Sequence, residues 1–338
     1  MTASCERLLT IRAGTELGHD GLVTSPIAAP LTPGVRPPRL REGELVALVA
    51  PSGPVPHDQL DAGVAILESW GLGVRVMPHV RDVHPVHAYL AGADMGRAED
   101  FSNAWAASDV RAIVCVRGGY GSQRMLDLID WAALRAAEPK VLVGYSDVTA
   151  LHQAIATELG VVTLHGPMSG TGSFVNSPAA QEHLRATLFE PESVQVLSSP
   201  AGQAAARPLV GGAAVGVTTG GCVSMLTTSV ATRTSLAARG GLVLLEDVDE
   251  KAYRIDSYLT HLRRSGWFDG AAGVVLGSWA DCEPVEDVVT DVLGDLGVPI
   301  LGDLGFGHGA DSITVPLGVL AELDADAGQL TLEQPALA

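Results

Sequence analysis

Short apolar runs alternate with segments of helical periodicity along the first half of the chain. Three runs are continuously apolar, at residues 45–50, 112–116 and 141–143, which is typical of strands buried on both faces of a parallel sheet. Residues 73–77, which are apolar except for Arg75, predict one more strand. The segments between and after them have apolar residues at intervals of three or four, which predict helices. These are expected near residues 57–70, 97–108, 123–129 and 148–159. The alternation predicts a doubly wound α/β domain with a parallel sheet over residues 41–185.

The composition changes after residue 185. Residues 186–210 are loop-like and are expected to form a linker, and residues 211–338 show strand and helix patterns of their own. We expect a second, smaller α/β domain there, closed by a hairpin near its end. At the other end of the chain, residues 1–40 contain five prolines between Pro26 and Pro38. Such a density of proline predicts an extended or poorly ordered extension.

Composition narrows the class of protein. The 338 residues suggest about two domains at roughly 150 residues each. Acidic residues outnumber Lys and Arg by 39 to 21, a balance that argues against nucleic acid and against an anionic membrane surface as partners. The four cysteines form no CxxC pair, and no run of about 18 apolar residues or secretory leader pattern is evident. These features predict a cytoplasmic globular protein without a membrane partner.

The strongest local signal is the glycine-rich loop at residues 117–122 (RGGYGS), between a predicted strand and a predicted helix. Ligands of doubly wound sheets bind where the strand order reverses, and an order beginning 2-1-3 places this loop beside residues 51–54. Ser122 would then be presented on a tight turn as a nucleophile. Two other interpretations stay open. Ser122 is also a suitable helix N-cap, and the loop could bind phosphate, although it lacks the P-loop lysine.

A serine nucleophile needs a base, and the base needs an orienting acid. His308 lies in the glycine-rich segment 304–309, which favours a presented rather than a packed imidazole; an ordinary surface histidine is the alternative. Glu246 directly follows an apolar strand, so its carboxylate is expected at the end of that strand. The alternative is a solvated acidic turn. Its acidic neighbours are Asp247, Asp249 and Glu250.

Other candidates are weaker. His79, His84 and His87 are close enough in sequence to suggest zinc, but no carboxylate or cysteine accompanies them at ligand spacing, so no metal is predicted. Cys115 lies inside an apolar run and is expected to be a buried small side chain. Ser146 stands at a strand end beside an aspartate and is expected to belong to an ordinary helix cap.

Together these residues resemble the LD-carboxypeptidase family. The matching motifs follow the family order between about residue 45 and about residue 325. They lie at residues 117–122, 124–126, 144–147 with Thr149, 165–167, 220–221, 245–247, 253–256 and 307–308. One departure is Cys222, where many members have a polar residue such as asparagine. The resemblance implies a flavodoxin-like N-terminal domain, a C-terminal swivelling β/α domain and often a homodimer.

The resemblance also implies an activity. It makes the chain a serine peptidase with Ser122 as nucleophile, His308 as general base and Glu246 as orienting carboxylate. The family releases the terminal D-alanine of murein tetrapeptides, small peptide substrates, in cell-wall recycling, without a metal or other cofactor. A related branch, the microcin C immunity peptidases, cleaves the amide of a peptidyl nucleotide. A non-catalytic protein that binds a small ligand is the alternative from another class.

Binding residues are expected around the loop at residues 117–122. Backbone N–H groups would hold the oxyanion, and we expect one from Gln123 and one from Ser52 or Gly53, with Gly119 as a further donor. The guanidinium of Arg117 is suited to the terminal carboxylate of a peptide, or else to bracing the loop.

Overall fold

The structure is a computed structural model that describes residues 29–338. Residues 1–28 of the predicted extension at residues 1–40 lie outside the described residues. The first domain contains a six-stranded sheet in the order β12-β5-β4-β3-β1-β2. All neighbours are parallel except β12, which runs antiparallel to β5 at the edge. Its strands are β1 (Leu45–Val49), β2 (Gly73–Val76), β3 (Val110–Cys115), β4 (Val141–Gly144), β5 (Thr163–His165) and β12 (Val315–Leu317). The parallel order 2-1-3-4-5 is that of flavodoxin-like folds, which confirms the predicted class and the reversal between β1 and β3.

Helices pack against this sheet in layers. α1 packs with α6, and α6 with α7, whereas α2 packs with α3 and α4. Their bounds are α1 (His57–Ser69), α2 (Asp94–Ala106), α3 (Ser122–Met125), α4 (Trp131–Leu134), α5 (Thr149–Glu158), α6 (Gly172–Val175) and α7 (Pro178–Phe189). Short 3-10 turns are η1 (Leu126–Leu128), η2 (Ser146–Val148) and η3 (Pro191–Val194). Both β3 and β4 are buried along nearly their whole length, as their continuous apolar sequence predicts.

The second domain has a curled mixed sheet of eight strands in the order β6-β14-β13-β8-β9-β10-β11-β7. They are β6 (Val196–Leu197), β7 (Arg207–Val210), β8 (Ala213–Cys222), β9 (Gly241–Val248), β10 (Gly273–Ala280), β11 (Ile300–Gly302), β13 (Leu320–Asp324) and β14 (Gln329–Leu332). The predicted closing hairpin is confirmed as the antiparallel pair β13–β14. The helices are α8 (Val223–Ser229), α9 (Ala252–Arg264) and α10 (Glu286–Leu293), followed by η4 (Gly294–Leu296).

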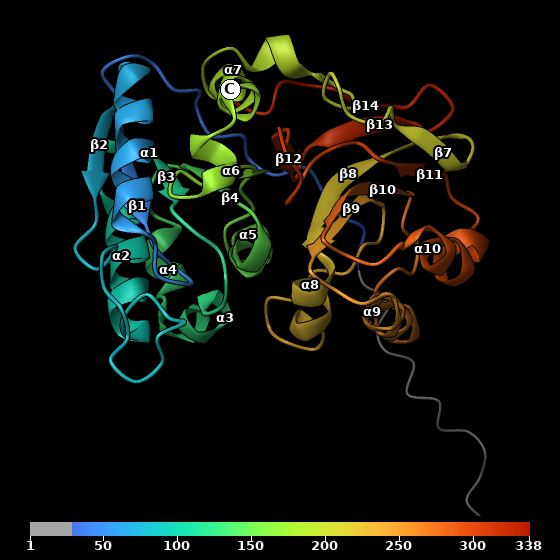
Figure 1. Ribbon diagram of the computed structural model, residues 1–338, viewed down its shortest axis with the longest axis horizontal. Helices are drawn as coiled ribbons and strands as arrows, with labels where there is room; N and C mark the ends of the chain where they lie inside the picture. Colours follow the sequence, from blue (N-terminus) through green and yellow to red (C-terminus); the bar gives the residue numbers. More distant parts are fainter. Residues whose placement is uncertain (1–28) are drawn as a thin grey trace, which may run out of the picture.

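The two domains lie side by side, with α5 and α8 in contact where they meet (Figure 1). The chain crosses between them more often than the predicted boundaries allow. β6 and β7 fall in the predicted linker, yet both belong to the second sheet, whereas β12 joins the first sheet. Near the C-terminus, Ala336 and Leu337 are buried in the core of the first domain. These exchanges bury apolar residues of distant segments against one another, which local periodicity does not reveal.

Residues 29–40 are extended, as their prolines predict, but they are not loose. The N–H of Leu31 donates to the carbonyl of Arg239 in the second domain, and that of Val35 donates to Gly160 in the first. Leu40 is fully buried. For this part of the chain the expectation of poor order is wrong, because its backbone groups are paired with both domains. Within residues 29–338, no helix combines the length and apolar character required to cross a membrane.

Candidate active site

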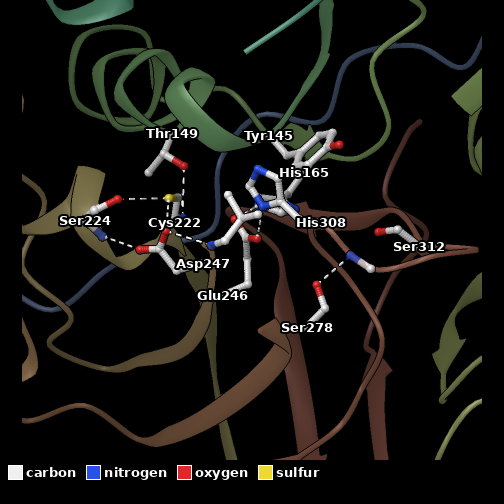
Figure 2. Close-up of polar contacts among 12 residues, drawn as sticks. Tyr145, Thr149, His165, Cys222, Ser224, Glu246, Asp247, Ser278, His308 and Ser312 are labelled. Carbon is white, nitrogen blue, oxygen red and sulfur yellow. Dashed lines mark hydrogen bonds and ion pairs between the residues drawn. The ribbon is translucent and has the colours of Figure 1, made fainter. Parts of the chain in front are cut away.

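A fully buried carboxylate and a histidine meet at the boundary between the domains. His308 Nδ1 lies 2.6 Å from Glu246 Oε2 (Figure 2). Glu246 is 0 % exposed and the His308 side chain 14 %, so the imidazole alone of the two reaches solvent. The structure therefore brings together the predicted base and the predicted acid, in the geometry that fixes a histidine tautomer and leaves Nε2 free.

The alternation of side chains along β9 explains why Glu246 and its neighbour Asp247 have different partners. Successive side chains of a strand point to opposite faces. Leu242 and Leu244 pack into one core and Val243 and Leu245 into the other. Glu246 continues the first series and faces the loop that carries His308.

Asp247 continues the second series. It accepts a hydrogen bond from the Ser224 amide at 2.8 Å, and the Cys222 thiol lies 3.4 Å from its Oδ1 (Figure 2). Farther along, Glu250 pairs with Arg254 at the surface. The acidic segment is therefore a turn only after Asp247, and Glu246 and Asp247 are both held inside the fold.

Electrostatics favour the charged forms of Glu246 and His308. Burial by itself raises the pKa of Glu246, but the charge of His308 and the polar influence of the His165 and His308 rings outweigh it and lower the pKa to about 2. Burial likewise opposes the charged form of His308, but the Glu246 carboxylate outweighs this and raises the pKa of His308 above its ordinary value. Glu246 is thus ionised at neutral pH and makes His308 a stronger base.

Ser122 is buried, and its polar groups are bonded to Asp147. Its side chain is 0 % exposed, and its hydroxyl donates to the Asp147 carbonyl at 2.6 Å. Its amide donates to the Asp147 carboxylate at 2.8 Å. The amide and the hydroxyl of Ser122 therefore both hold the glycine-rich loop against the segment that follows β4. In this arrangement the proton of the Ser122 hydroxyl is held by a backbone carbonyl.

Ser146, the other serine near a strand end, has an unusual backbone conformation. It directly follows β4 and has φ +63°, a left-handed conformation that costs a non-glycine residue about 1–2 kcal/mol. No side chain caps η2 or α5, so the expected helix cap at Ser146 and Asp147 is wrong. A Cβ added at Gly118 would lie only 3.0 Å from the Ser146 hydroxyl oxygen, which shows how closely the glycine-rich loop approaches.

Contacts across the domain boundary join residues close to Ser146 in sequence to the elements that carry Glu246 and His308. Tyr145, its neighbour in sequence, packs edge-on against His308 with ring centroids 4.7 Å apart (Figure 2). Thr149, in the same turn, accepts a hydrogen bond from the Cys222 amide at 3.1 Å (Figure 2). Cys222 is in turn the register partner of Glu246 in the sheet. Residues close to Ser146 in sequence therefore contact His308 itself and the strand paired with β9, which carries Glu246.

The other residues predicted to bind the oxyanion or the substrate make contacts of their own. The Gly53 amide donates to the Gly118 carbonyl at 2.9 Å, which removes it as an oxyanion donor, and Ser52 is fully buried. Gln123 bridges to α8 through its side-chain amide, which lies 3.1 Å from the Ser229 hydroxyl. Arg117 is exposed and donates to the Pro54 carbonyl at 2.5 Å, so it braces the loop.

A surface pocket of about 640 Å³ borders the loop. Its lining residues are Gly53, Pro54, Ala88, Tyr89, Arg117, Gly119 and Tyr120. Arg117 is the one charged residue of this lining, and Tyr89 and Tyr120 are both about half exposed. The pocket therefore combines aromatic surface with a single positive charge, next to the loop that packs on Ser146.

The histidines considered for zinc do not form a ligand set. His79 Nδ1 lies 2.9 Å from an oxygen of Asp100, and the ring of His84 stacks on that of His87. Residues 29–338 contain no group of three or more metal-ligating side chains suited to an ion. Cys115 is fully buried, as expected, and burial raises the pKa of its thiol far above the usual range.

A buried carboxylate–histidine pair in an α/β fold is a feature of many serine hydrolases. Comparisons with known proteins specify the class. The LD-carboxypeptidase N-terminal domain model matches residues 46–166, and the LD-carboxypeptidase C-terminal domain model matches residues 215–323. The chain belongs to the LD-carboxypeptidase family.

Relatives cover nearly the whole chain. A Streptomyces coelicolor protein named "Putative carboxypeptidase" is 57% identical over 90% of this chain and 97% of its own length. The murein tetrapeptide carboxypeptidase of Pseudomonas aeruginosa is 32% identical over 83% of this chain and 93% of its own. Among solved structures, MccF in complex with glutamyl sulfamoyl guanosine has a TM-score of 0.79 at 20% identity, covering 90% of this chain and 99% of that one. The muramoyltetrapeptide carboxypeptidase of Oxalobacter formigenes has a TM-score of 0.71 at 26% identity, covering 85% and 97%.

Proposed function

We propose that this protein is a serine peptidase that releases the terminal D-alanine from murein tetrapeptide, with Ser146 as nucleophile, His308 as general base and Glu246 as orienting acid. The single observation that carries the proposal is the buried Glu246–His308 pair at 2.6 Å, packed against Tyr145, the residue that precedes a strained serine at the end of β4. Family membership and the names of the relatives support the reaction class and the kind of substrate.

In the proposed mechanism His308 Nε2 takes the proton of the Ser146 hydroxyl as its oxygen attacks the scissile carbonyl. Glu246 holds the Nδ1–H and stabilises the imidazolium. The imidazolium then returns the proton to the leaving amine of D-alanine, and an acyl-enzyme remains on Ser146. Water, deprotonated by the same histidine, releases the shortened peptide.

The oxyanion requires donors that are not engaged elsewhere. The amide of Asp147 follows the proposed nucleophile and stands in the first turn of η2, where backbone N–H groups have no intrahelical acceptor. The amide of Gly119 lies in the loop that packs on Ser146, and neither amide donates to another backbone group of the described residues. We assign these two N–H groups to the oxyanion hole, in place of those of Gln123 and Gly53.

Arg117 is suited to the terminal carboxylate of the substrate, because it lines the pocket beside Gly119 and only part of its guanidinium is bonded to Pro54. Arg117→Gln should lower kcat/KM by about 10–100-fold, the usual cost of losing a hydrogen bond to a charged group. The drop should disappear with a substrate whose C-terminus is amidated. Arg81→Gln, which breaks only an exposed pair with Asp61, is the control and should change neither rate. If Arg117→Gln lowered kcat/KM equally on both substrates, Arg117 would only brace the loop and would not bind the terminal carboxylate.

The function is tested by incubating the purified protein with murein tetrapeptide and measuring free D-alanine. Labelling by a fluorophosphonate, lost in Ser146→Ala, identifies the nucleophile independently. Release of D-alanine with labelling at Ser146 supports the proposal. Cleavage of a peptidyl nucleotide without release of D-alanine would instead assign the protein to the immunity-peptidase branch. If neither cleavage nor labelling occurred, the protein would instead be a non-catalytic protein that binds a small ligand.

The homodimer implied by the family resemblance and the cytoplasmic location stay predictions. Light scattering of the purified chain measures the first, and fractionation of the producing cell measures the second.

A further inference from the structure

The second oxygen of the Glu246 carboxylate is left without a hydrogen bond. Oε2 lies 2.6 Å from His308 Nδ1, whereas Oε1 is buried and has no partner among the described residues. His165 Nε2 lies 3.6 Å from Oε1, just beyond hydrogen-bond distance. Buried carboxylates normally have their acceptor sites occupied, because burial has removed the water that would solvate them. The gap between these two atoms therefore requires an explanation.

His165 is held firmly in this position. It is the last residue of β5 and has register partners on both sides, Gly144 in β4 and Val315 in β12. It is fully buried, and neither of its ring nitrogens has a hydrogen-bond partner among the described residues.

The nearby His152 shows the ordinary arrangement of a buried histidine. Its Nδ1 lies 2.8 Å from the Thr163 hydroxyl and its Nε2 2.9 Å from the Gly144 carbonyl. Both ring nitrogens are thus satisfied locally, and the ring has no need of a carboxylate. Of these two buried histidines, one in α5 and one in β5, only His165 has ring N–H capacity to spare, and its Nε2 is the atom nearest to Glu246 Oε1.

Most of the titratable side chains around His165 and Glu246 are uncharged at neutral pH. Burial lowers the pKa of His152 to about 3, so this ring is neutral. Burial raises the pKa of both Tyr145 and Cys222, which are therefore protonated. The remaining titratable groups near Glu246 are His308, which lies at Oε2, and Asp247, the next residue of β9.

We propose that His165 is a positioning residue that donates from Nε2 to Glu246 Oε1 and thereby turns Oε2 toward His308. A shift of about 0.5 Å brings the two atoms within hydrogen-bond distance. His165 belongs to the first domain, with Ser146, and Glu246 to the second, with His308. The bond therefore aligns the half of the site that carries the nucleophile with the half that carries the base. The inference rests on the proposed function and deepens it.

The test compares His165→Gln with His165→Met. Both substitutions remove the ring and leave an unbranched side chain of similar length, but only glutamine keeps an N–H donor at the position of Nε2. His165→Met should lower kcat by about 10–100-fold with KM nearly unchanged, the cost of a lost hydrogen bond to a charged group. His165→Gln should recover most of the loss. His152→Gln, a change at a buried histidine whose nitrogens face other groups, should alter thermal stability but not the pH profile.

The pH profile separates positioning from packing. Without the His165 donor, the charge of Glu246 is less compensated and acts more strongly on His308, so the pKa of His308 should rise in His165→Met. The acid limb of kcat/KM should then move to higher pH, and in His165→Gln it should stay near that of the wild type. Equal kcat and equal acid limbs in the two variants would overturn the proposal.

An NMR pH titration of the His308 ring, without substrate, makes the result independent of the proposed reaction. If the wild-type protein released no D-alanine, the proposed function would fail, while the His308 titration would still show whether His165 acts on Glu246. A His308 pKa that is the same in wild type, His165→Gln and His165→Met would reject the positioning role even in an active peptidase.

Discussion

Ser146→Ala should reduce the release of D-alanine by about 10⁴-fold or more while the protein remains folded. Members of a catalytic triad act as a unit, so removing the nucleophile leaves only the contribution of binding and of the oxyanion hole. The hydroxyl caps no helix, so its removal should cost little stability. The measurements are kcat on murein tetrapeptide and the midpoint of thermal unfolding.

Ser122→Ala is the matched control. It removes a hydrogen bond of 2.6 Å to the Asp147 carbonyl and should destabilise the fold by about 1 kcal/mol, with activity reduced less than about tenfold. Ser146→Gly adds a second readout. Since Ser146 has φ +63°, glycine should relieve the strain and make this variant about 1–2 kcal/mol more stable than Ser146→Ala. Wild-type turnover in Ser146→Ala, with collapse in Ser122→Ala, would return the role of nucleophile to Ser122.

The parallel sheet and the acid–base pair could be predicted because each rests on a local pattern. Continuous apolar runs predicted β1, β3 and β4, and the alternation of β9 carries Glu246 to the face of the strand opposite to that of Asp247. The glycine-rich segment around His308 favoured a presented imidazole, and the structure places that ring against Glu246.

The choice between the two serines could not be made in this way. Ser122 and Ser146 both follow a strand and begin a helical turn, and both stand beside residues that cap helices well. They differ in a backbone angle and in the partners of their hydroxyl groups, which depend on how two loops pack together. The one local signal for Ser146 was its place directly after a buried strand, where ligands of doubly wound sheets bind.

The crossing of the chain between domains was hidden for a similar reason. β12 is only three residues long, and its pairing with β5 joins segments about half the chain apart. A strand of so few residues is too short to show a hydrophobic periodicity from which it could be predicted. This pairing nevertheless matters for the site, because Val315 is the register partner of His165 and helps to hold that ring beside Glu246.

Glu246→Gln should lower kcat by roughly 10²–10⁴-fold and leave substrate affinity nearly unchanged, because the carboxylate faces the histidines and not the ligand. Its effect on pH dependence has a definite sign. The negative charge of Glu246 raises the pKa of His308. Activity requires neutral His308, so removing the charge should lower that pKa and move the acid limb of kcat/KM to lower pH. This shift is opposite to the one expected for His165→Met.

The acidic neighbours of Glu246 provide the controls. Asp249→Asn and Glu250→Gln change side chains of the surface turn and should reduce kcat less than about tenfold, as substitutions away from the reacting groups do. Asp247→Asn weakens the hold on the Ser224 amide and should mainly lower the unfolding temperature. Measuring kcat, the acid limb and thermal unfolding for all four variants on one substrate separates the roles. Collapse of activity in Asp247→Asn with Glu246→Gln unaffected would move the acid by one residue, to the opposite face of β9. If all four variants kept their activity, His308 would act without a carboxylate and the proposed triad would be wrong.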